Sequence, residues 1–364
     1  MKVLVLGGTG LVGSAIIRKL LEKGYKDIYA TYHIRSPKEI ENINWVKADL
    51  TRQEETEELF SKIKPDHVYL CSAKVGGILA NNTYKADFIY ANLAIALNAI
   101  HSAYKFGVKK LLNLGSSCIY PKFAPQPMKE EYLLTGPLEP TNEPYAIAKI
   151  SAIKLCRYYN EQYGTNFISV MPTNLYGPND NFDLFTSHVL PAFIRKFHLA
   201  KLLRAQDMEG IRKDFDKNPV EGVDGKADEK SILRVLSKYG IKSDSVTIWG
   251  TGEVYREFLY VDDLADACVY LMERVDAEDM KRLSPDYFVN IGTGEDLKVK
   301  DLAYLVKKIV GFDGEILHDL SKPDGTPRKL LDVTKIKELG WEPKVSLEEG
   351  IRRTYKWYLG FLNT

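Results

Sequence analysis

The 364-residue sequence is poor in cysteine, has no excess of one charge and contains no long apolar run. Its four cysteines, Cys71, Cys118, Cys156 and Cys268, form no C-x-x-C pair, which argues against a disulfide framework or a metal site. Fifty basic side chains balance 49 acidic ones, so we expect neither nucleic acid nor an anionic membrane as a partner. No charged leader or cleavage site precedes the first apolar run, and we expect a cytosolic protein.

Strands and helices alternate in the first part of the chain. Short apolar or β-branched runs predict strands at residues 3–6, 28–32, 45–48, 67–71, 110–114 and 167–171. Longer amphipathic segments predict helices at residues 11–21, 54–63, 88–104 and 145–163. This alternation predicts an α/β fold, a Rossmann-type doubly wound parallel sheet with right-handed crossovers.

After residue 173 the regular alternation stops, which predicts a second part of the molecule. We expect one more strand at 246–249 and helices at 264–273, 301–309 and 348–358. Residues 1–173 and about 246–274 are assigned to the cofactor-binding domain. Residues from about 174 to 245 and from 275 to 364 are assigned to a smaller C-terminal α/β substrate domain, with the chain crossing back to the sheet at least once.

A glycine-rich turn joins the first predicted strand to the first helix. Glycines at 7, 10 and 13 permit a tight turn, close approach of a pyrophosphate and close packing of the helix on the sheet. The helix N-terminus offers unpaired N–H groups to phosphate. A glycine turn without a ligand is the alternative, but the strand-to-helix context favours a dinucleotide site. The residues assigned to it are Gly7, Thr9, Gly10, Leu11, Val12 and Gly13.

No acidic residue follows the second predicted strand, where NAD-binding proteins usually hold the ribose 2′-hydroxyl. Residues 31–35 instead end in Arg35, whose guanidinium can bind a 2′-phosphate. An ordinary solvent-exposed arginine is the alternative. The missing acid favours NADP. Asp49 and Leu50, after the third predicted strand, are candidates for contacts on the adenine side.

Tyr145 and Lys149 are spaced one helical turn apart and therefore share one helix face. A phenol exchanges protons near neutral pH only if a neighbouring cation stabilises its phenolate, and Lys149 provides such a charge. Ser116, just beyond the predicted strand 110–114, can hydrogen-bond the same reacting oxygen. With the dinucleotide loop upstream, this arrangement predicts an oxidoreductase site.

Several motifs now carry a family resemblance. The segments are residues 73–78, 81–84, 116–121, 140–145, 172–178, 187–191 and 322–329. Together they resemble the GDP-L-fucose synthase family of the extended short-chain dehydrogenase/reductases. The resemblance covers nearly the whole chain except about 201–245.

The resemblance implies a bifunctional NADPH-dependent 3,5-epimerase and 4-reductase that converts GDP-4-keto-6-deoxy-D-mannose to GDP-L-fucose. It places Cys118 and His188 as the acid–base pair of the epimerisation, where the alternatives are an inert buried cysteine and a packing histidine. Ser116, Tyr145 and Lys149 would stabilise the oxygen at C4. A related GDP-4-keto sugar such as a heptose, or loss of one half-reaction, remains an alternative. A non-catalytic NADP-binding regulatory protein is disfavoured because Tyr145 and Lys149 are both present.

The resemblance also implies binding residues. On the cofactor side these are Ala73, Lys74, Lys149, Pro172, Asn174, Leu175 and His188. For the GDP-sugar they are Asn174, Lys196, Trp249, Arg256 and, with a weaker signal, Lys329. Position 196 departs from the pattern, since an arginine is also seen there in the family and a lysine offers a point charge instead of a fork of donors.

Residues from about 201 to 245 form an insertion, because shorter family members pass almost directly between the flanking segments. Its residues 218–226 are rich in turn formers and residues 232–239 are amphipathic. It is either a surface elaboration or a wall over the sugar-nucleotide cleft. The resemblance further suggests a homodimer packed through the helices around 88–104 and 145–163, although apolar residues there could equally belong to the core.

Overall fold

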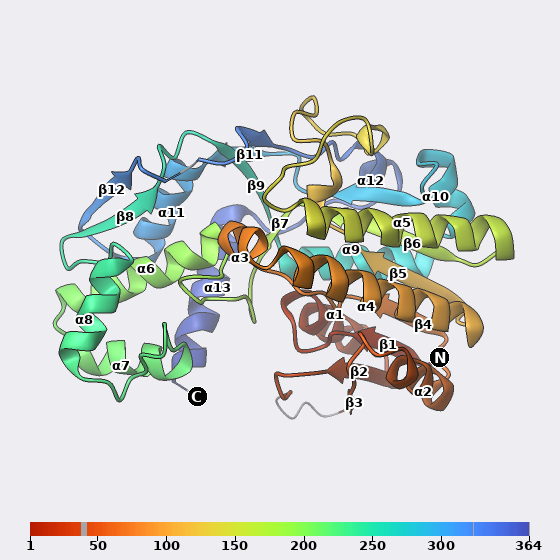
Figure 1. Ribbon diagram of the computed structural model, residues 1–364, viewed down its shortest axis with the longest axis horizontal. Helices are drawn as coiled ribbons and strands as arrows, with labels where there is room; N and C mark the ends of the chain where they lie inside the picture. Colours follow the sequence, from red (N-terminus) through yellow and green to blue (C-terminus); the bar gives the residue numbers. More distant parts are fainter. Residues whose placement is uncertain (38–41, 323, 364) are drawn as a thin grey trace.

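The computed structural model describes residues 1–37, 42–322 and 324–363. Within these residues, seven parallel strands form the main sheet in the order β10-β6-β5-β4-β1-β2-β3 (Figure 1). The strands are β1 (Val3–Leu6), β2 (Ile28–Tyr32), β3 (Ile43–Lys47), β4 (His67–Leu70), β5 (Lys110–Leu114), β6 (Phe167–Pro172) and β10 (Phe288–Ile291). The order reverses between β1 and β4, which is where open α/β sheets bind their ligands.

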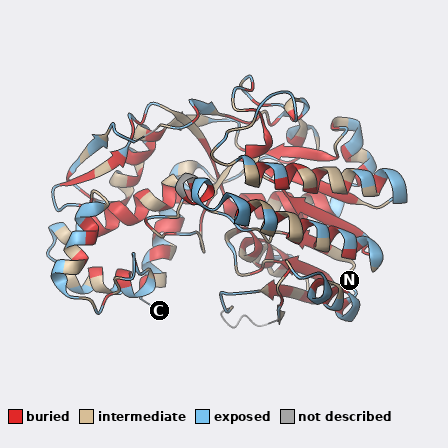
Figure 2. Ribbon diagram, viewed as in Figure 1, coloured by how far each residue is buried: buried red, intermediate tan, exposed pale blue. Residues whose placement is uncertain are grey.

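Helices cover both faces of this sheet: α1 (Leu11–Glu22), α2 (Gln53–Ile63), α4 (Lys85–Lys105), α5 (Glu143–Tyr163), α9 (Val261–Arg274), α10 (Ala277–Leu283) and α12 (Thr334–Glu338). The short helix α3 (Ile78–Thr83) lies at the N-terminal end of α4. Successive strand residues point to opposite faces. Val3 and Val5 therefore pack in one core with α1 and α9, whereas Leu4 and Leu6 pack in another with α2 and α4. Figure 2 shows the strands buried and the outer helix faces exposed.

The second part of the molecule holds α6 (Val189–Arg204), α7 (Met208–Lys217), α8 (Glu229–Lys238), α11 (Val299–Val310) and α13 (Leu347–Leu362) around a core of its own. Strand β8 (Ser245–Trp249) pairs with β12 (Glu315–Asp319). Strand β9 (Tyr255–Tyr260) pairs with β7 (Asn174–Tyr176), β11 (Asp296–Lys298) and β13 (Arg328–Lys329). Short 3₁₀ turns lie at Ser117–Ile119 and Glu130–Tyr132. Among the described residues no helix combines the length and apolarity that crossing a membrane requires.

The predicted fold class is confirmed, and each strand and helix predicted in the first part is present with its ends shifted by a few residues at most. The division of the later residues differs in detail. Strand β10 joins the main sheet beside β6, although residues 275–364 were assigned to the substrate domain. Of residues 246–274, α9 and Leu259 of β9 pack in the core of the main sheet, whereas the strands β8 and β9 pair within the second part.

The insertion folds as regular structure. It contains the end of α6 followed by α7 and α8, and the turn-rich residues 218–226 connect the last two helices. Asp207 and Asp228 cap α7 and α8 by accepting hydrogen bonds from the backbone N–H groups of Gly210 and Ser231. Its apolar side chains, among them Phe215, are buried in the second core. The insertion is therefore built into the second part.

A fully buried ion pair fixes α7 against α6. The Arg195 guanidinium donates to Asp214 at 2.8 Å through Nε, and Tyr358 also donates to this carboxylate. The other N–H groups of Arg195 donate to the carbonyls of Phe182 at 3.1 Å and Asn218 at 2.6 Å. Both charged side chains have 0% exposure, so every bond in this cluster is made without water. Arg195 thus joins the insertion to the loop that leads to residue 188.

We expect Asp214→Ala to lower the free energy of unfolding by about 3–5 kcal/mol, because it leaves a buried guanidinium without its counter-charge. Denaturant unfolding measures the change. Glu209→Ala is the matched control, since it breaks an exposed pair with Lys213 on the same helix and should cost about 0.5 kcal/mol or less. Equal effects of the two substitutions would contradict the role given to the buried pair.

Candidate active site

A cavity of about 740 Å³ opens beside the carboxyl ends of β5 and β6, and both parts of the molecule contribute to its walls. It gathers residues that are far apart in the sequence. The predicted residues that line it are Ser116, Cys118, Tyr145, Asn174, Leu175, His188, Lys196, Trp249, Arg256 and Lys329. The structure therefore brings four of the five predicted catalytic side chains and all predicted substrate-binding residues to one space.

The loop after β5 carries Ser116 and Cys118. A 3₁₀ turn lets the Ser116 hydroxyl accept a hydrogen bond of 3.4 Å from the Cys118 backbone N–H, which fixes both residues at the cavity wall. Burial raises the pKa of the Cys118 thiol, and the Ser116 hydroxyl and the charges of Lys329 and Lys149 act against that rise. The thiol is therefore protonated in the free protein. The two lysine charges nevertheless make its ionisation easier than burial alone would allow.

Tyr145 and Lys149 lie in the first turns of α5, on the face expected from their spacing. Lys149 donates a hydrogen bond of 2.7 Å to the Leu114 carbonyl at the end of β5, and its Nζ lies 5.6 Å from the centroid of the Tyr145 ring. Burial lowers the pKa of Lys149 to about 8 and raises that of Tyr145. The ammonium thus lies beside the phenol ring without bonding it, and Tyr145 holds its proton in the free protein.

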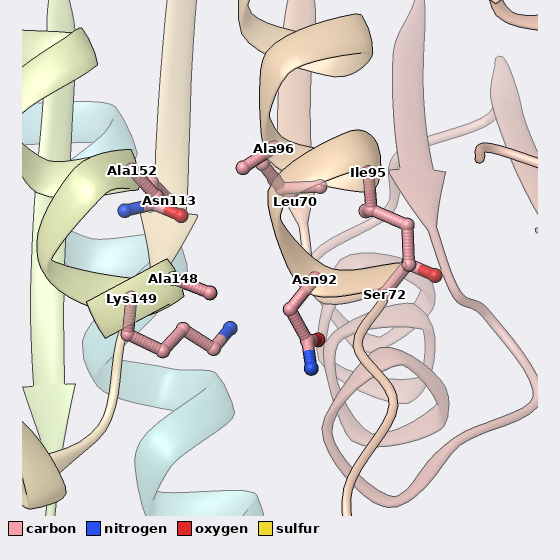
Figure 3. Close-up of a pocket in the computed structure, with 9 residues that line it drawn as sticks. All are labelled: Leu70, Ser72, Asn92, Ile95, Ala96, Asn113, Ala148, Lys149 and Ala152. Atoms are coloured by element: carbon pink, nitrogen blue, oxygen red, sulfur yellow. The ribbon is translucent and has the colours of Figure 1, made fainter. Parts of the chain in front are cut away.

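Behind Lys149 lies a small pocket between α4 and α5, shown in Figure 3. Its volume of about 10 Å³ suits a single water molecule. Asn92 on α4 faces it, and the amide of Asn92 bonds both backbone groups of Lys74, at 2.9 Å and 3.0 Å. This buried amide holds the loop after β4, where Ala73 and Lys74 were predicted to bind cofactor. Asn92 was not predicted, although it is a polar residue among the buried apolar residues of α4.

His188 caps the N-terminus of α6 with extended backbone, and its side chain opens onto the cavity. His188 is exposed where it borders the cavity, and partial withdrawal from water lowers the pKa of its imidazole, an effect to which the nearby charge of Lys329 adds. The ring is therefore neutral at physiological pH and can accept a proton. His188 and Cys118 face the same cavity from different parts of the molecule.

Cationic side chains line the cavity next to these groups. Lys196 is 7% exposed and donates to the Thr247 carbonyl at 3.1 Å, and burial lowers the pKa of Lys196 to about 8. Burial also lowers the pKa values of Arg256 and Lys329, which lie near each other. Trp249 is 51% exposed at the rim. Three partly desolvated cations in one cavity would attract a multiply charged anion.

Glu257 joins the two parts at the floor of the site. Its buried carboxylate accepts backbone N–H bonds from Thr293 at 2.7 Å, Gly294 at 2.8 Å and Leu331 at 2.9 Å. Its own carbonyl accepts the Asn174 amide at 2.8 Å. Burial raises the pKa of Glu257, and the N–H bonds counter that rise. Asn174 is thereby fixed where β6 leads into β7.

The glycine loop has the shape that a dinucleotide requires. Gly7 has a φ of +86°, and a Cβ there would lie 2.8 Å from the Cα of Ser72. A Cβ on Gly13 would lie 2.1 Å from the Gly7 carbonyl oxygen. Gly10 caps α1 without any side-chain hydrogen bond, and the first turn contains no acid. A bare, positively polarised helix end therefore faces the ligand side.

The predicted adenine-side residues lie at the ends of β2 and β3. Arg35 is exposed, and no carboxylate pairs with it among the residues that the structure describes. Asp49 accepts a hydrogen bond of 2.7 Å from the Thr51 hydroxyl and lies 3.9 Å from His33. The Leu50 side chain is buried in the core, so only its backbone can face a ligand. Pro172 ends β6 and is buried there.

Several polar or aromatic cavity residues were not predicted, among them Lys122, Glu139, Asn142 and Tyr239. Glu139 pairs with Lys122 at 3.0 Å and also acts on Lys329, where its charge opposes the lowering of the Lys329 pKa. Tyr239 comes from the insertion, and no motif in the sequence identifies it. Its position at the end of an amphipathic helix was the only available signal.

Comparisons with known proteins agree with this geometry. Residues 3–213 and 219–292 match the NAD dependent epimerase/dehydratase family. GDP-L-fucose synthase 1 of Arabidopsis thaliana is 50% identical over 98% of this chain and 93% of its own. The structure of a GDP-6-OMe-4-keto-L-xylo-heptose reductase from C. jejuni is 39% identical, with a TM-score of 0.87 over 99% of this chain and 98% of that one. A GDP-mannoheptose C4 reductase from Campylobacter jejuni with NADP bound is 39% identical, with a TM-score of 0.81 over 98% of each chain.

Proposed function

Because this chain belongs to the NAD dependent epimerase/dehydratase family and is similar to GDP-L-fucose synthase over nearly its whole length, we propose that it is an NADPH-dependent 3,5-epimerase and 4-reductase that makes GDP-L-fucose from GDP-4-keto-6-deoxy-D-mannose. The observation that carries the proposal is the single cavity. It combines an acid–base pair, two hydroxyls for an oxyanion and three cations for a diphosphate.

The glycine loop and Arg35 support NADP as the cofactor. The loop between β1 and α1 would hold the pyrophosphate, and the exposed guanidinium of Arg35, which no carboxylate of the described residues pairs with, would bind the 2′-phosphate. Bound NADPH supplies the hydride for the reduction at C4. Lys149, Asn92 and Asn174 keep the loops after β4, β5 and β6 in place around that site.

Epimerisation needs proton removal beside the ketone and proton return on the opposite face of the ring. Cys118 and His188 reach the cavity from different elements, so they can serve opposite faces of a sugar held between them. His188 is neutral and Cys118 is protonated in the free site, which provides one acceptor and one donor. The Ser116 and Tyr145 hydroxyls would stabilise the negative charge that develops on the C4 oxygen.

Reduction at C4 needs a proton for the same oxygen. Burial keeps the Tyr145 phenol protonated until that oxygen becomes basic, so Tyr145 is the proton donor. The Lys149 charge, 5.6 Å from the ring centroid, then stabilises the phenolate that remains. One oxyanion site would thus serve both half-reactions in sequence. Lys196, Arg256 and Lys329 would hold the diphosphate, with Asn174 and Trp249 beside them.

A second candidate follows from the two heptose reductase structures, which match this chain over nearly its full length. The enzyme would then act on a GDP-4-keto heptose with the same residues. Incubation with NADPH and each GDP-keto sugar, with the product identified by NMR, separates the candidates. We expect GDP-L-fucose from GDP-4-keto-6-deoxy-D-mannose, and absence of a 6-deoxy-L-galactose product would favour the heptose.

The two half-reactions should respond differently to substitution. Tyr145→Phe removes the proton donor and should slow NADPH oxidation by about 10²–10⁴-fold, with NADPH affinity within about twofold of the unsubstituted enzyme. Cys118→Ser should slow solvent deuterium incorporation at C3 and C5 more than it slows hydride transfer. Equal loss of both rates in Cys118→Ser would argue against a dedicated epimerisation role for the thiol.

GDP affinity should depend on pH through Lys196. Its folded pKa of about 8 means that the free protein loses this charge as the pH rises above about 8. Bound diphosphate favours the charged form, so GDP affinity should fall above that pH, by up to about tenfold per unit. Lys196→Arg keeps its charge and should abolish this dependence. A parallel fall in both proteins, measured by calorimetry with GDP, would remove Lys196 from the diphosphate site.

We also propose a homodimer that packs through α4 and α5. Tyr90, Leu97 and Tyr104 recur every seven residues on α4 and are 70%, 49% and 37% exposed. Ile147 and Tyr158 extend the exposed apolar surface on α5. A stripe of this kind on adjacent helices suits a twofold four-helix contact.

Leu97→Glu should convert the dimer to a monomer in light-scattering measurements, because it places a charge in the centre of the stripe. Leu320→Glu is the control, since that leucine is 71% exposed on the other part of the molecule. A monomeric unsubstituted protein, or an unchanged mass for Leu97→Glu, would rule this interface out.

The four cysteines support a reducing compartment, which we propose to be the cytoplasm. Each is a free thiol, and Cys118, Cys156 and Cys268 are buried. An oxidising compartment would put the Cys118 thiol at risk of oxidation, because it borders the open cavity.

A further inference from the structure

One end of the cavity is built from the second part of the molecule and is mostly apolar. Its walls there come from the loop before α6, from α6, β8 and β9, and from the residue after α8, and include Leu184, Phe193, Ile248, Phe258 and Tyr239. Figure 1 shows α8 on the opposite side of the molecule from α5, which carries Tyr145. A GDP-sugar with its keto group at Tyr145 and its diphosphate on the cations would extend its nucleoside toward this end.

We infer that Tyr239, supplied by the insertion, is a substrate-binding residue whose ring packs on the nucleobase of the GDP-sugar. The inference rests on the proposed function for the identity of the ligand. It assigns the insertion a direct part in substrate binding, since Tyr239 is the insertion residue that lines the cavity. Flat bases bind aromatic rings by stacking, in a way that depends little on the rest of the ligand.

A chain of backbone bonds places Tyr239 beside the diphosphate site. Gly240 follows it with a φ of +71° and turns the chain from α8 toward β8. The Gly240 carbonyl accepts a hydrogen bond of 2.8 Å from the N–H of Thr247, and the Thr247 carbonyl accepts the Lys196 ammonium at 3.1 Å. A Cβ at Gly240 would lie 2.7 Å from the Cβ of Thr247, so the close approach requires glycine. Tyr239 and Lys196 are thereby tied to the same short stretch of β8.

The orientation of the ring is fixed as well. The Tyr239 hydroxyl donates to the Glu221 carboxylate at 2.9 Å, and Lys238 binds the same carboxylate. Glu221 lies in the connection between α7 and α8, so both insertion helices position the ring. The side chain is half-buried, and its hydroxyl is held by Glu221, a residue that does not line the cavity. An aromatic ring held in this way loses little conformational freedom when a base stacks on it.

The insertion itself is held rigidly. The buried pair of Arg195 and Asp214 fixes α7, and Arg195 is the neighbour of Lys196 on α6. Tyr239, Lys196 and the ion pair of Arg195 and Asp214 therefore belong to one packed unit. This unit holds Lys196 and Tyr239 at a fixed separation, which suits a ligand with a diphosphate at one point and a base at another.

Calorimetric titration with GDP tests the inference without the keto sugar. Tyr239→Ala should weaken GDP binding by about tenfold, whereas Tyr239→Phe keeps the ring and should stay within about threefold. Tyr304→Ala, at a 55% exposed tyrosine on α11, is the matched control and should leave GDP affinity unchanged. The kcat for NADPH oxidation should change less than the KM for the GDP-sugar, because the ring is remote from the reacting carbon.

Tyr239→Leu guards against a folding defect, since it keeps apolar bulk under α8 and removes the flat ring; it should lose as much GDP affinity as Tyr239→Ala. GDP affinity unchanged in both variants overturns the inference. If the unsubstituted protein binds UDP in preference to GDP and both variants weaken that binding, Tyr239 is still the base platform and the proposed substrate is wrong. If the unsubstituted protein binds neither diphosphate, the proposed function and the inference both fail.

Discussion

The buried carboxylate of Glu257 is the interaction on which the site depends most. It lies where the main sheet meets the second part of the molecule, and its oxygens collect backbone N–H groups from the segment after β10 and from the segment after β13. A carboxylate in such a place is stable only when its oxygens are fully bonded. Gly292 has no room for a side chain beside it, since a Cβ would lie 2.2 Å from the Glu257 oxygen. Glu257 therefore fixes how the main sheet and the second part meet. The shape of the cavity between them depends on this junction.

The charge distribution of the cavity follows from burial. Lys149, Lys196, Arg256 and Lys329 all have lowered pKa values because they are withdrawn from water. Two carboxylates offset part of this charge: Asp324 acts on Arg256, and Glu139, which pairs with Lys122, acts on Lys329. The protein holds these cations at a cost in folding free energy, and an anionic ligand relieves that cost when it binds. The same buried cations thus raise the affinity for an anionic substrate and lower the stability of the free protein.

Sequence alone predicted what local pattern determines. The glycine spacing at 7, 10 and 13 and the i, i+4 spacing of Tyr145 and Lys149 are local, and the structure places them as expected. A return of the chain to the sheet was expected, but β10 was not located, because it pairs with β6 more than a hundred residues away. Glu257, Asn92 and Tyr239 acquire their positions only through tertiary contacts. Lys149 was expected to support the phenol of Tyr145, and its bond to the Leu114 carbonyl shows that the free site satisfies the ammonium in another way. The roles assigned to individual site residues remain predictions.

The neighbouring positions of Arg195 and Lys196 on α6 have a consequence for redesign. The Arg195 side chain bonds the insertion, and we propose that the Lys196 side chain binds the ligand. Because the two residues are adjacent, a shift of one moves the other. Exchanging the insertion for a loop of another length would leave the Arg195 guanidinium without its partners. It would also displace the helix turn that positions the Lys196 ammonium. A chimaera built at this locus must therefore carry α6, α7 and α8 together, as one transplantable module.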